Sequence, residues 1–222
     1  MSIKDNLDRI MNELPARVKL VAVSKFHPVE RLMEAYNAGQ RLFGENRPQE
    51  FAAKVPLMPA DVQWHFIGHL QTNKLKLVLP HASLVESVDS MHLLEAINAW
   101  GAANGKVVPI LLELHLGAEE TKHGFSEEDI IEIFRVRAVP SLKNLEFRGL
   151  MGMATNTDDE AVIEADFARI EALFNRIREE FPELLDTFTE LSIGMSGDWP
   201  LAVKHGATIV RIGTDIFGER EY

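Results

Sequence analysis

The sequence predicts a (β/α)8 barrel, the TIM-barrel architecture of the α/β class, with an extra helix at its N-terminus. Short apolar runs alternate with amphipathic stretches throughout the 222 residues, which is typical of parallel strands joined by helices. Eight such runs can be counted, and eight strands close this barrel. Single barrels of this kind routinely have this length. A doubly wound open sheet is the competing architecture, because a count of strands does not exclude it.

The expected strands are uninterrupted runs of Val, Leu, Ile and Ala, as suits strands that are buried on both faces of a sheet. The fifth run is the most hydrophobic of them. In chain order the strands are expected at residues 18–24, 41–44, 63–67, 84–88, 107–116, 147–154, 189–193 and 208–212.

Amphipathic spacing and helix-start residues indicate the helices between these strands. At the N-terminus, apolar residues recur every three or four positions from Ile3 to Leu14, and Pro15 ends the pattern. No linker, repeat or low-complexity tract divides the chain, so residues 1–222 are expected to form a single domain. The remaining helices are expected at residues 28–38, 48–54, 73–79, 90–103, 126–136, 158–180 and 200–205.

The composition excludes several classes of function. The formal charge is −11, with 23 basic against 34 acidic residues, which argues against binding to nucleic acid or to an anionic membrane. There is no cysteine, so disulfides, thiolate nucleophiles and cysteine-based metal sites are excluded. No apolar run approaches ~18 residues and no signal pattern opens the chain, so we expect residence in the cytoplasm.

Lys25 stands directly after the first expected strand, at the end of an apolar run. In α/β folds, ligands bind at the carboxyl ends of the strands. An amine held there beside apolar walls loses hydration, which lowers its pKa and lets it attack a carbonyl. Lys25 is therefore a candidate Schiff-base lysine, although most lysines at strand ends are solvated surface charges.

Two loops of small residues follow the last two strands, at 192–198 and 210–215. Their glycines let the backbone approach an anion, and Ser196, Thr214 and nearby N–H groups supply donors. These loops form a frequent phosphate site in barrels, and closure would put the eighth strand beside the first. Lys25 and a phosphate site would then share one mouth, which is what pyridoxal 5′-phosphate (PLP) needs.

Other residues near strand ends admit two interpretations each. Asn46 lies either in a turn or with its amide at the mouth. His65 is either a hydrogen-bonded core histidine or a polar group near a ligand. Met151 and Met153 share one face of the sixth strand, either packed in the core or lining an apolar pocket. His65 and His69 do not form an HExxH motif, so the sequence predicts no zinc site from them.

Several stretches resemble the pyridoxal phosphate homeostasis protein family. They occur in order from about residue 18 to the C-terminus, so the resemblance covers nearly the whole chain. The matching stretches are residues 22–25 (AVSK), 43–46 (FGEN), 64–74 (WHFIGHLQTNK), 122–125 (KHGF), 148–151 (RGLM), 192–198 (SIGMSGD) and 210–214 (VRIGT).

The resemblance implies a single barrel like the N-terminal domain of bacterial alanine racemase, with PLP as cofactor. It assigns the imine to one lysine, phosphate contacts to the C-terminal loops and further contacts to the pyridine ring. The candidate cofactor-binding residues are Lys25 at the imine, Asn46 and His65 near the ring, Arg211 near the pyridine nitrogen, Ser196, Gly213 and Thr214 at the phosphate, and Met151 in the pocket wall.

The same resemblance bears on activity. Arg211 cannot accept a proton, so a pyridine nitrogen facing it should stay unprotonated and the ring should be a poorer electron sink. Alanine racemase is active and has such an arginine too. The expectation that this protein is not an enzyme therefore rests more on the second domain of the racemase, which helps close its site and has no counterpart in the residues up to Tyr222.

We therefore expect a monomer without catalytic activity that buffers PLP and supplies it to apo-enzymes. A PLP-dependent amino-acid racemase or decarboxylase is the alternative. An aldolase that uses Lys25 on a phosphorylated sugar is a third hypothesis.

Overall fold

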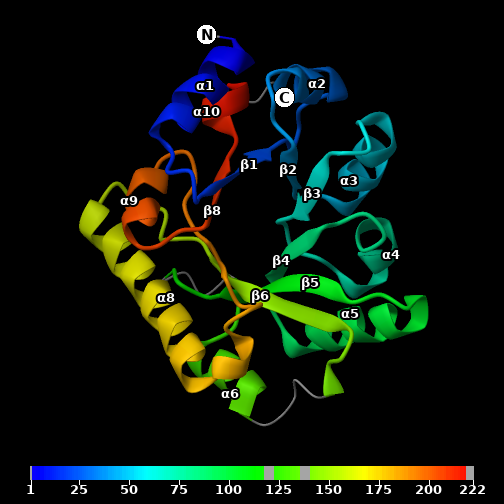
Figure 1. Ribbon diagram of the computed structural model, residues 1–222, viewed down its shortest axis with the longest axis vertical. Coiled ribbons are helices and arrows are strands. Elements are labelled where there is room, and N and C mark those ends of the chain that lie inside the picture. Colours follow the sequence, from blue (N-terminus) through cyan, green and yellow to red (C-terminus); the bar gives the residue numbers. More distant parts are fainter. Residues whose placement is uncertain (1, 118–122, 136–140, 219–222) are drawn as a thin grey trace.

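Eight parallel strands close into a barrel in chain order, as the sequence predicts (Figure 1). The computed structural model describes residues 2–117, 123–135 and 141–218. The last strand pairs with the first, in the register Lys19↔Ile209 and Leu20↔Val210, which excludes an open sheet. The strands are β1 (Lys19–Val23), β2 (Leu42–Glu45), β3 (Gln63–Phe66), β4 (Leu84–Val88), β5 (Val108–Leu114), β6 (Leu145–Gly152), β7 (Glu190–Ser192) and β8 (Ile209–Ile212).

Helices surround the barrel (Figure 1). Ser2 caps the first helix through its hydroxyl, and Asp5 completes a capping box, as suits the start of an amphipathic helix. None of the helices in the described parts of the chain is long and apolar enough to span a bilayer. They are α1 (Ile3–Glu13), α2 (Val29–Asn37), α3 (Pro48–Lys54), α4 (Leu75–Val78), α5 (Met91–Asn104), α6 (Glu127–Arg135), α8 (Glu160–Glu180), α9 (Trp199–Lys204) and α10 (Thr214–Phe217), with 3₁₀ turns at Val55–Leu57, Thr72–Lys74 and Pro182–Leu184.

The C-terminal helix α10 is absent from the sequence-based prediction, which treats residues 210–215 as strand end and loop. Four residues are too few to show a helical period. The helix is held by tertiary contacts instead: Asn6 of α1 donates its side-chain amide to the Ile216 carbonyl at 3.0 Å, and Phe217 is buried. The two helices lie side by side in Figure 1. Residue 136 of the expected sixth helix and Lys122 of the family motif lie outside the described residues.

A distinct apolar layer fills the interior of the barrel. It draws one residue from each of five strands and is separate from the larger core between strands and helices. Inward-facing side chains of the strands meet in this layer, which makes the barrel a packed core and not a pore. A ligand therefore has no room inside this layer and must bind at an end of the barrel. Its members are Val21, Leu84, Leu111, Met151 and Ile209.

A β-bulge between β5 and β6 places Gly149 where no side chain fits. Ile110 pairs with Phe147 and Leu111 pairs with Gly149, so Arg148 is an extra residue in β6. Gly149 has a φ of +150°, and a Cβ atom there would overlap the carbonyl oxygen of Glu190 in β7. Glycine is therefore required for β6 to pair with both neighbours.

We predict that Gly149→Ala lowers the free energy of unfolding by roughly 2–6 kcal/mol, because overpacking and backbone strain each cost about 1–3 kcal/mol. Urea unfolding followed by circular dichroism measures the change. Gly197→Ala is the control, since a Cβ atom there would meet no described heavy atom within 4 Å. Equal stability of the two variants would contradict the assignment.

Candidate functional site

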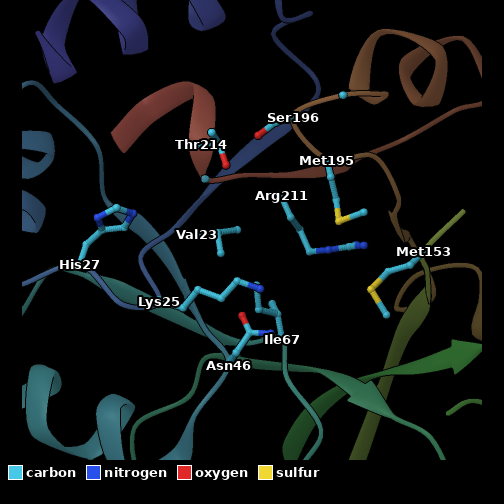
Figure 2. Close-up of a pocket in the computed structure, with 12 residues that line it drawn as sticks. Val23, Lys25, His27, Asn46, Ile67, Met153, Met195, Ser196, Arg211 and Thr214 are labelled. Carbon is cyan, nitrogen blue, oxygen red and sulfur yellow. The ribbon is translucent and has the colours of Figure 1, made fainter. Parts of the chain in front are cut away.

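A cavity opens at the carboxyl ends of the strands, directly above the interior layer. Val21, Met151 and Ile209 of that layer are each followed, two positions along the chain, by a residue that lines the cavity, as strand alternation requires. Figure 2 shows the cavity with its lining side chains. It is lined by Val23, Lys25, His27, Asn46, Ile67, Met153, Met195, Ser196, Gly197, Arg211, Gly213 and Thr214.

The structure brings six of the eight predicted site residues to this cavity, namely Lys25, Asn46, Ser196, Arg211, Gly213 and Thr214. It does not bring the other two there. Met151 is buried in the interior layer, one pleat below the cavity. His65 lines a hollow at the opposite end of the barrel, together with Lys19 and Gln63 at the starts of β1 and β3.

Five lining residues are absent from the sequence-based selection: Val23, His27, Ile67, Met195 and Gly197. The period of two along a strand identifies Val23 and Ile67, because every second residue of a strand faces the barrel interior. The other three lie in loops, where no periodic signal exists.

Lys25 extends from the end of β1 into the cavity, and Asn46 lies beside its end (Figure 2). The chain turns sharply after this lysine, because Phe26 adopts a φ of +68°, which is uncommon for a residue with a side chain. Such strain persists only where surrounding contacts impose it. Here the Phe26 N–H donates to a carboxylate oxygen of Glu50 in α3 at 2.7 Å.

Lys54 fixes the segment that carries Lys25. Its ammonium group is buried and donates to the Ser24 carbonyl at 2.7 Å and to the carboxylates of Glu45 and Glu50 at 2.6 Å each. Glu45 is fully buried and also accepts from the Ser24 hydroxyl at 2.7 Å. Burial raises the pKa of Glu45 although Lys54 opposes the shift. One buried ion pair thus joins β1, β2 and α3 beside Lys25.

Arg211 supplies a buried positive charge to the cavity wall. Its Nη1 donates to the Ser192 carbonyl at 2.8 Å and to the Ser192 hydroxyl at 2.6 Å, and its Nη2 donates to the Gly152 carbonyl at 2.9 Å. The Oε2 atom of Glu86 lies 3.8 Å from the Arg211 Nη1 atom. Burial lowers the pKa of Arg211, and nearby carboxylates, first among them Glu86, oppose this shift. The guanidinium is therefore held in one orientation by several directed bonds.

Glu86 connects Arg211 to His65 inside the barrel. One carboxylate oxygen lies 2.5 Å from the His65 Nδ1, and the other accepts from the Ser192 hydroxyl at 2.6 Å. Complete burial would raise the pKa of Glu86, but the hydrogen bond with His65 and the charges of His65 and Arg211 outweigh it, so that pKa is lowered. His65 thus acts on the cavity through Glu86 and Arg211, without lining it.

Two hydroxyls come together on one wall of the cavity. Ser196 follows β7 and Thr214 begins α10, and Figure 2 shows them near each other, across the cavity from Asn46. Gly213 packs closely against β1, where a Cβ atom would lie 3.2 Å from the Val23 carbonyl oxygen. Two hydroxyl donors on one wall suit an anionic group.

Asn46 brings an unsatisfied acceptor to the cavity. Its Oδ1 is buried and has no hydrogen-bond partner among the described residues. Buried amide oxygens are nearly always hydrogen-bonded, so this atom fits a donor on a bound molecule. The Asn46 backbone packs so closely against Gly68 that a Cβ atom there would overlap it.

Glu113 lines a second hollow next to the cavity, and the two share Asn46, Ile67 and Met153. Burial and then the charge of Asp89 raise the pKa of Glu113 to about 7, against the opposing charges of Arg211 and His69. Glu113 can therefore exchange a proton near neutral pH.

The fold and the cavity define a (β/α)8-barrel protein with a lysine, a buried arginine and paired hydroxyls around one small-molecule pocket. The family model of the alanine racemase N-terminal domain matches residues 1–221. A pyridoxal phosphate homeostasis protein of Schizosaccharomyces pombe is 40% identical, over 91% of this chain and 84% of that relative. The one from Vibrio alginolyticus is 36% identical, over 100% of this chain and 99% of that relative.

Solved structures agree with these relatives. PipY of Synechococcus elongatus PCC7942, with PLP bound, has a TM-score of 0.89 and 37% identity, over 98% of this chain and 100% of that chain. The chain therefore belongs to the pyridoxal phosphate homeostasis protein family, within the alanine racemase N-terminal-domain family, which confirms the resemblance seen in the sequence.

We predict that Lys54→Met lowers the free energy of unfolding by about 3–5 kcal/mol, because it leaves the buried Glu45 carboxylate without its partner. Urea unfolding measures the loss. The double variant Lys54→Met/Glu45→Leu removes both charges and should recover most of the stability. A single variant as stable as the wild type would show that Lys54 does not hold this segment.

We predict that Glu113 makes stability fall as pH rises. Its folded pKa of about 7 exceeds the ordinary value of 4.5, so its contribution is complete below pH 4.5 and is lost as pH rises through 7. Glu113→Gln should therefore exceed the wild type in unfolding free energy by up to about 3 kcal/mol at pH 8 and by under about 1 kcal/mol at pH 5. Urea unfolding of the two cofactor-free proteins measures this difference at each pH. An equal difference at pH 5 and pH 8 would contradict the raised pKa of Glu113.

Proposed function

We propose that this protein binds PLP as an imine to Lys25 and serves in PLP homeostasis, by holding the cofactor and supplying it to apo-enzymes. The observation that carries the proposal is one cavity with a lysine side chain extending into it and the hydroxyls of Ser196 and Thr214 on its wall (Figure 2). PLP combines an aldehyde, which needs an amine, with a phosphate, which needs donors and positive charge. The names of the relatives and the PLP-bound PipY structure support it.

Each lining residue has a part that its chemistry fits. Lys25 supplies the amine. Ser196, Gly213 and Thr214 hold the phosphate through two hydroxyls and backbone N–H groups. Asn46 offers its unsatisfied Oδ1 to a donor on the bound molecule.

Arg211 determines the electronic character of the site. A guanidinium only donates hydrogen bonds, so a pyridine nitrogen that faces it stays unprotonated and the ring withdraws electrons less strongly. Ser192, Gly152 and Glu86 hold Arg211 in place for this part. Alanine racemase has such an arginine too, so it is the names of the relatives that favour storage and transfer of the cofactor over chemistry on amino acids.

For residues 1–222 we propose one PLP-binding domain that acts as a monomer in the cytoplasm, with PLP-requiring apo-enzymes as recipients. The family match over residues 1–221 supports a single unit. Light scattering on the purified protein tests the monomer, and reactivation of an apo-enzyme by the PLP-loaded protein tests the transfer.

A PLP-dependent racemase or decarboxylase is the second candidate, and Glu113 is the observation that favours it. A carboxyl group with a pKa of about 7 is suited to proton transfer near neutral pH. Turnover of L- or D-amino acids above that of free PLP, lost in Glu113→Gln, would establish this function. Turnover no faster than with free PLP would exclude it.

We predict that adding PLP produces the visible absorbance of an imine in the wild type and not in Lys25→Ala, because only that lysine extends into the cavity among the described residues. Borohydride reduction followed by peptide mass spectrometry should locate the modification on Lys25. Lys76→Ala, on the exposed face of α4, is the matched control and should keep the band. The same band in Lys25→Ala would assign the cofactor to another lysine.

A further inference from the structure

We propose that His69, Asp89 and His123 form a binding site for a divalent transition-metal ion, with Zn²⁺ as the best-suited ion, at the barrel mouth beside the PLP cavity. Each residue offers one ligand atom, and these atoms all lie within 4.8 Å of one another. The sequence predicts no zinc site, because His65 and His69 form no motif. In the structure the partners of His69 are Asp89 and His123, and His65 is not among them. This site stands independently of PLP binding.

The fold brings the three residues together from three successive β-to-α connections. His69 follows β3 and Asp89 directly follows β4, while His123 lies between β5 and α6. Two residues after His123, the Phe125 N–H donates to the Glu113 carbonyl at 2.8 Å and the Phe125 carbonyl accepts from the His115 N–H at 3.0 Å. These two bonds tie the segment next to His123 to the end of β5.

The carboxylate of Asp89 is oriented toward both imidazoles. Its side chain is only 5% exposed, and its Oδ1 accepts from the Ser90 hydroxyl at 3.1 Å. Its Oδ2 lies 2.7 Å from the Nδ1 of His69 and 3.7 Å from the Nδ1 of His123. A ligand whose other oxygen is hydrogen-bonded in this way is held for coordination.

The two imidazoles are accessible to an ion from solvent. Their side chains are 46% and 60% exposed, and their rings stack with centroids 4.2 Å apart. Ligands of tetrahedral Zn²⁺, at about 2.0–2.1 Å from the metal, are about 3.3–3.5 Å apart, and the two distances from the Asp89 oxygen lie on either side of this range. Exposed rings can turn about their side-chain bonds, so a small rotation of each brings both nitrogens to one ion.

The charge of the surrounding hollow favours a cation. His69 and His123 line it together with Glu113, whose carboxyl group is buried. The buried carboxyl groups of Asp89 and Glu113 repel each other when both are ionised, and a divalent ion at the three ligands offsets that repulsion. A water molecule completes four-coordination. Two imidazoles and a carboxylate are the ligand set of many zinc sites.

Isothermal titration of ZnCl₂ into the cofactor-free, untagged protein, in a buffer without phosphate, tests the site. We expect one saturable site per chain. His69→Gln and His123→Gln should each weaken binding at least tenfold, since even loss of a residue that only orients a ligand costs about 10–100-fold. Asp89→Asn should do the same. His81→Gln, an exposed histidine away from the cluster, is the control and should bind like the wild type.

Three outcomes would overturn the site: no saturable binding, binding unchanged in both histidine variants, or an anomalous Zn²⁺ peak elsewhere in a crystal. Circular dichroism checks the folding of each variant, and if the less exposed Asp89→Asn does not fold, the two exposed histidine variants decide alone. Retention of the PLP absorbance band in His69→Gln and His123→Gln keeps this test separate from the proposed PLP function.

Discussion

The parallel pairing of β8 with β1 determines what the site contains. These strands come from opposite ends of the chain, and their register sets Val21 opposite Arg211 and Ala22 opposite Ile212. The residues that continue each strand therefore meet at the mouth, and Gly213 packs against the Val23 carbonyl. Without this closure, the lysine after β1 and the hydroxyl of Thr214 would belong to separate edges of a sheet.

Both cations of the cavity rest on buried ion networks. Lys54 and Glu45 hold the segment before Lys25, while Glu86 holds Arg211. Buried ion pairs rarely add stability over apolar side chains of the same size, because each charge loses its hydration. The two ion pairs lie next to Lys25 and Arg211, which indicates that they orient these residues toward the cavity. Directed bonds select one rotamer of the Arg211 side chain, and the bonds to Ser24 fix the backbone from which Lys25 extends.

Much of this architecture was predictable from the sequence, because its signals are local. Apolar runs and amphipathic spacing give the alternation of strands and helices, and small-residue loops after the last strands give the wall with Ser196 and Thr214. Lys25 is found by its place at a strand end. These features depend on neighbours within a few positions of the chain, which a single sequence displays.

The remaining features depend on side-chain direction and on distant partners. Met151 and Met153 share one face and look alike in the sequence, yet Met151 lies in the interior layer and only Met153, one pleat further along, lines the cavity. Lys54 ends a helix like many surface lysines, and only the fold shows that it is buried beside Glu45. His69 acquires its partners from two other strand ends. The spacing of residues along the chain does not predict contacts between such distant positions.

The net charge of −11 shows how composition and site can differ. It argues against a polyanion such as nucleic acid, which contacts a broad surface. A single phosphate, by contrast, responds to charges within about 10 Å, the Debye length at 0.1 M salt. At the cavity those charges include Lys25 and Arg211, whereas the adjoining hollow is lined by Glu113. The two hollows share Asn46, Ile67 and Met153, so the positive charges and the carboxyl group lie on opposite sides of a common wall, and a net negative chain still presents a cationic cavity.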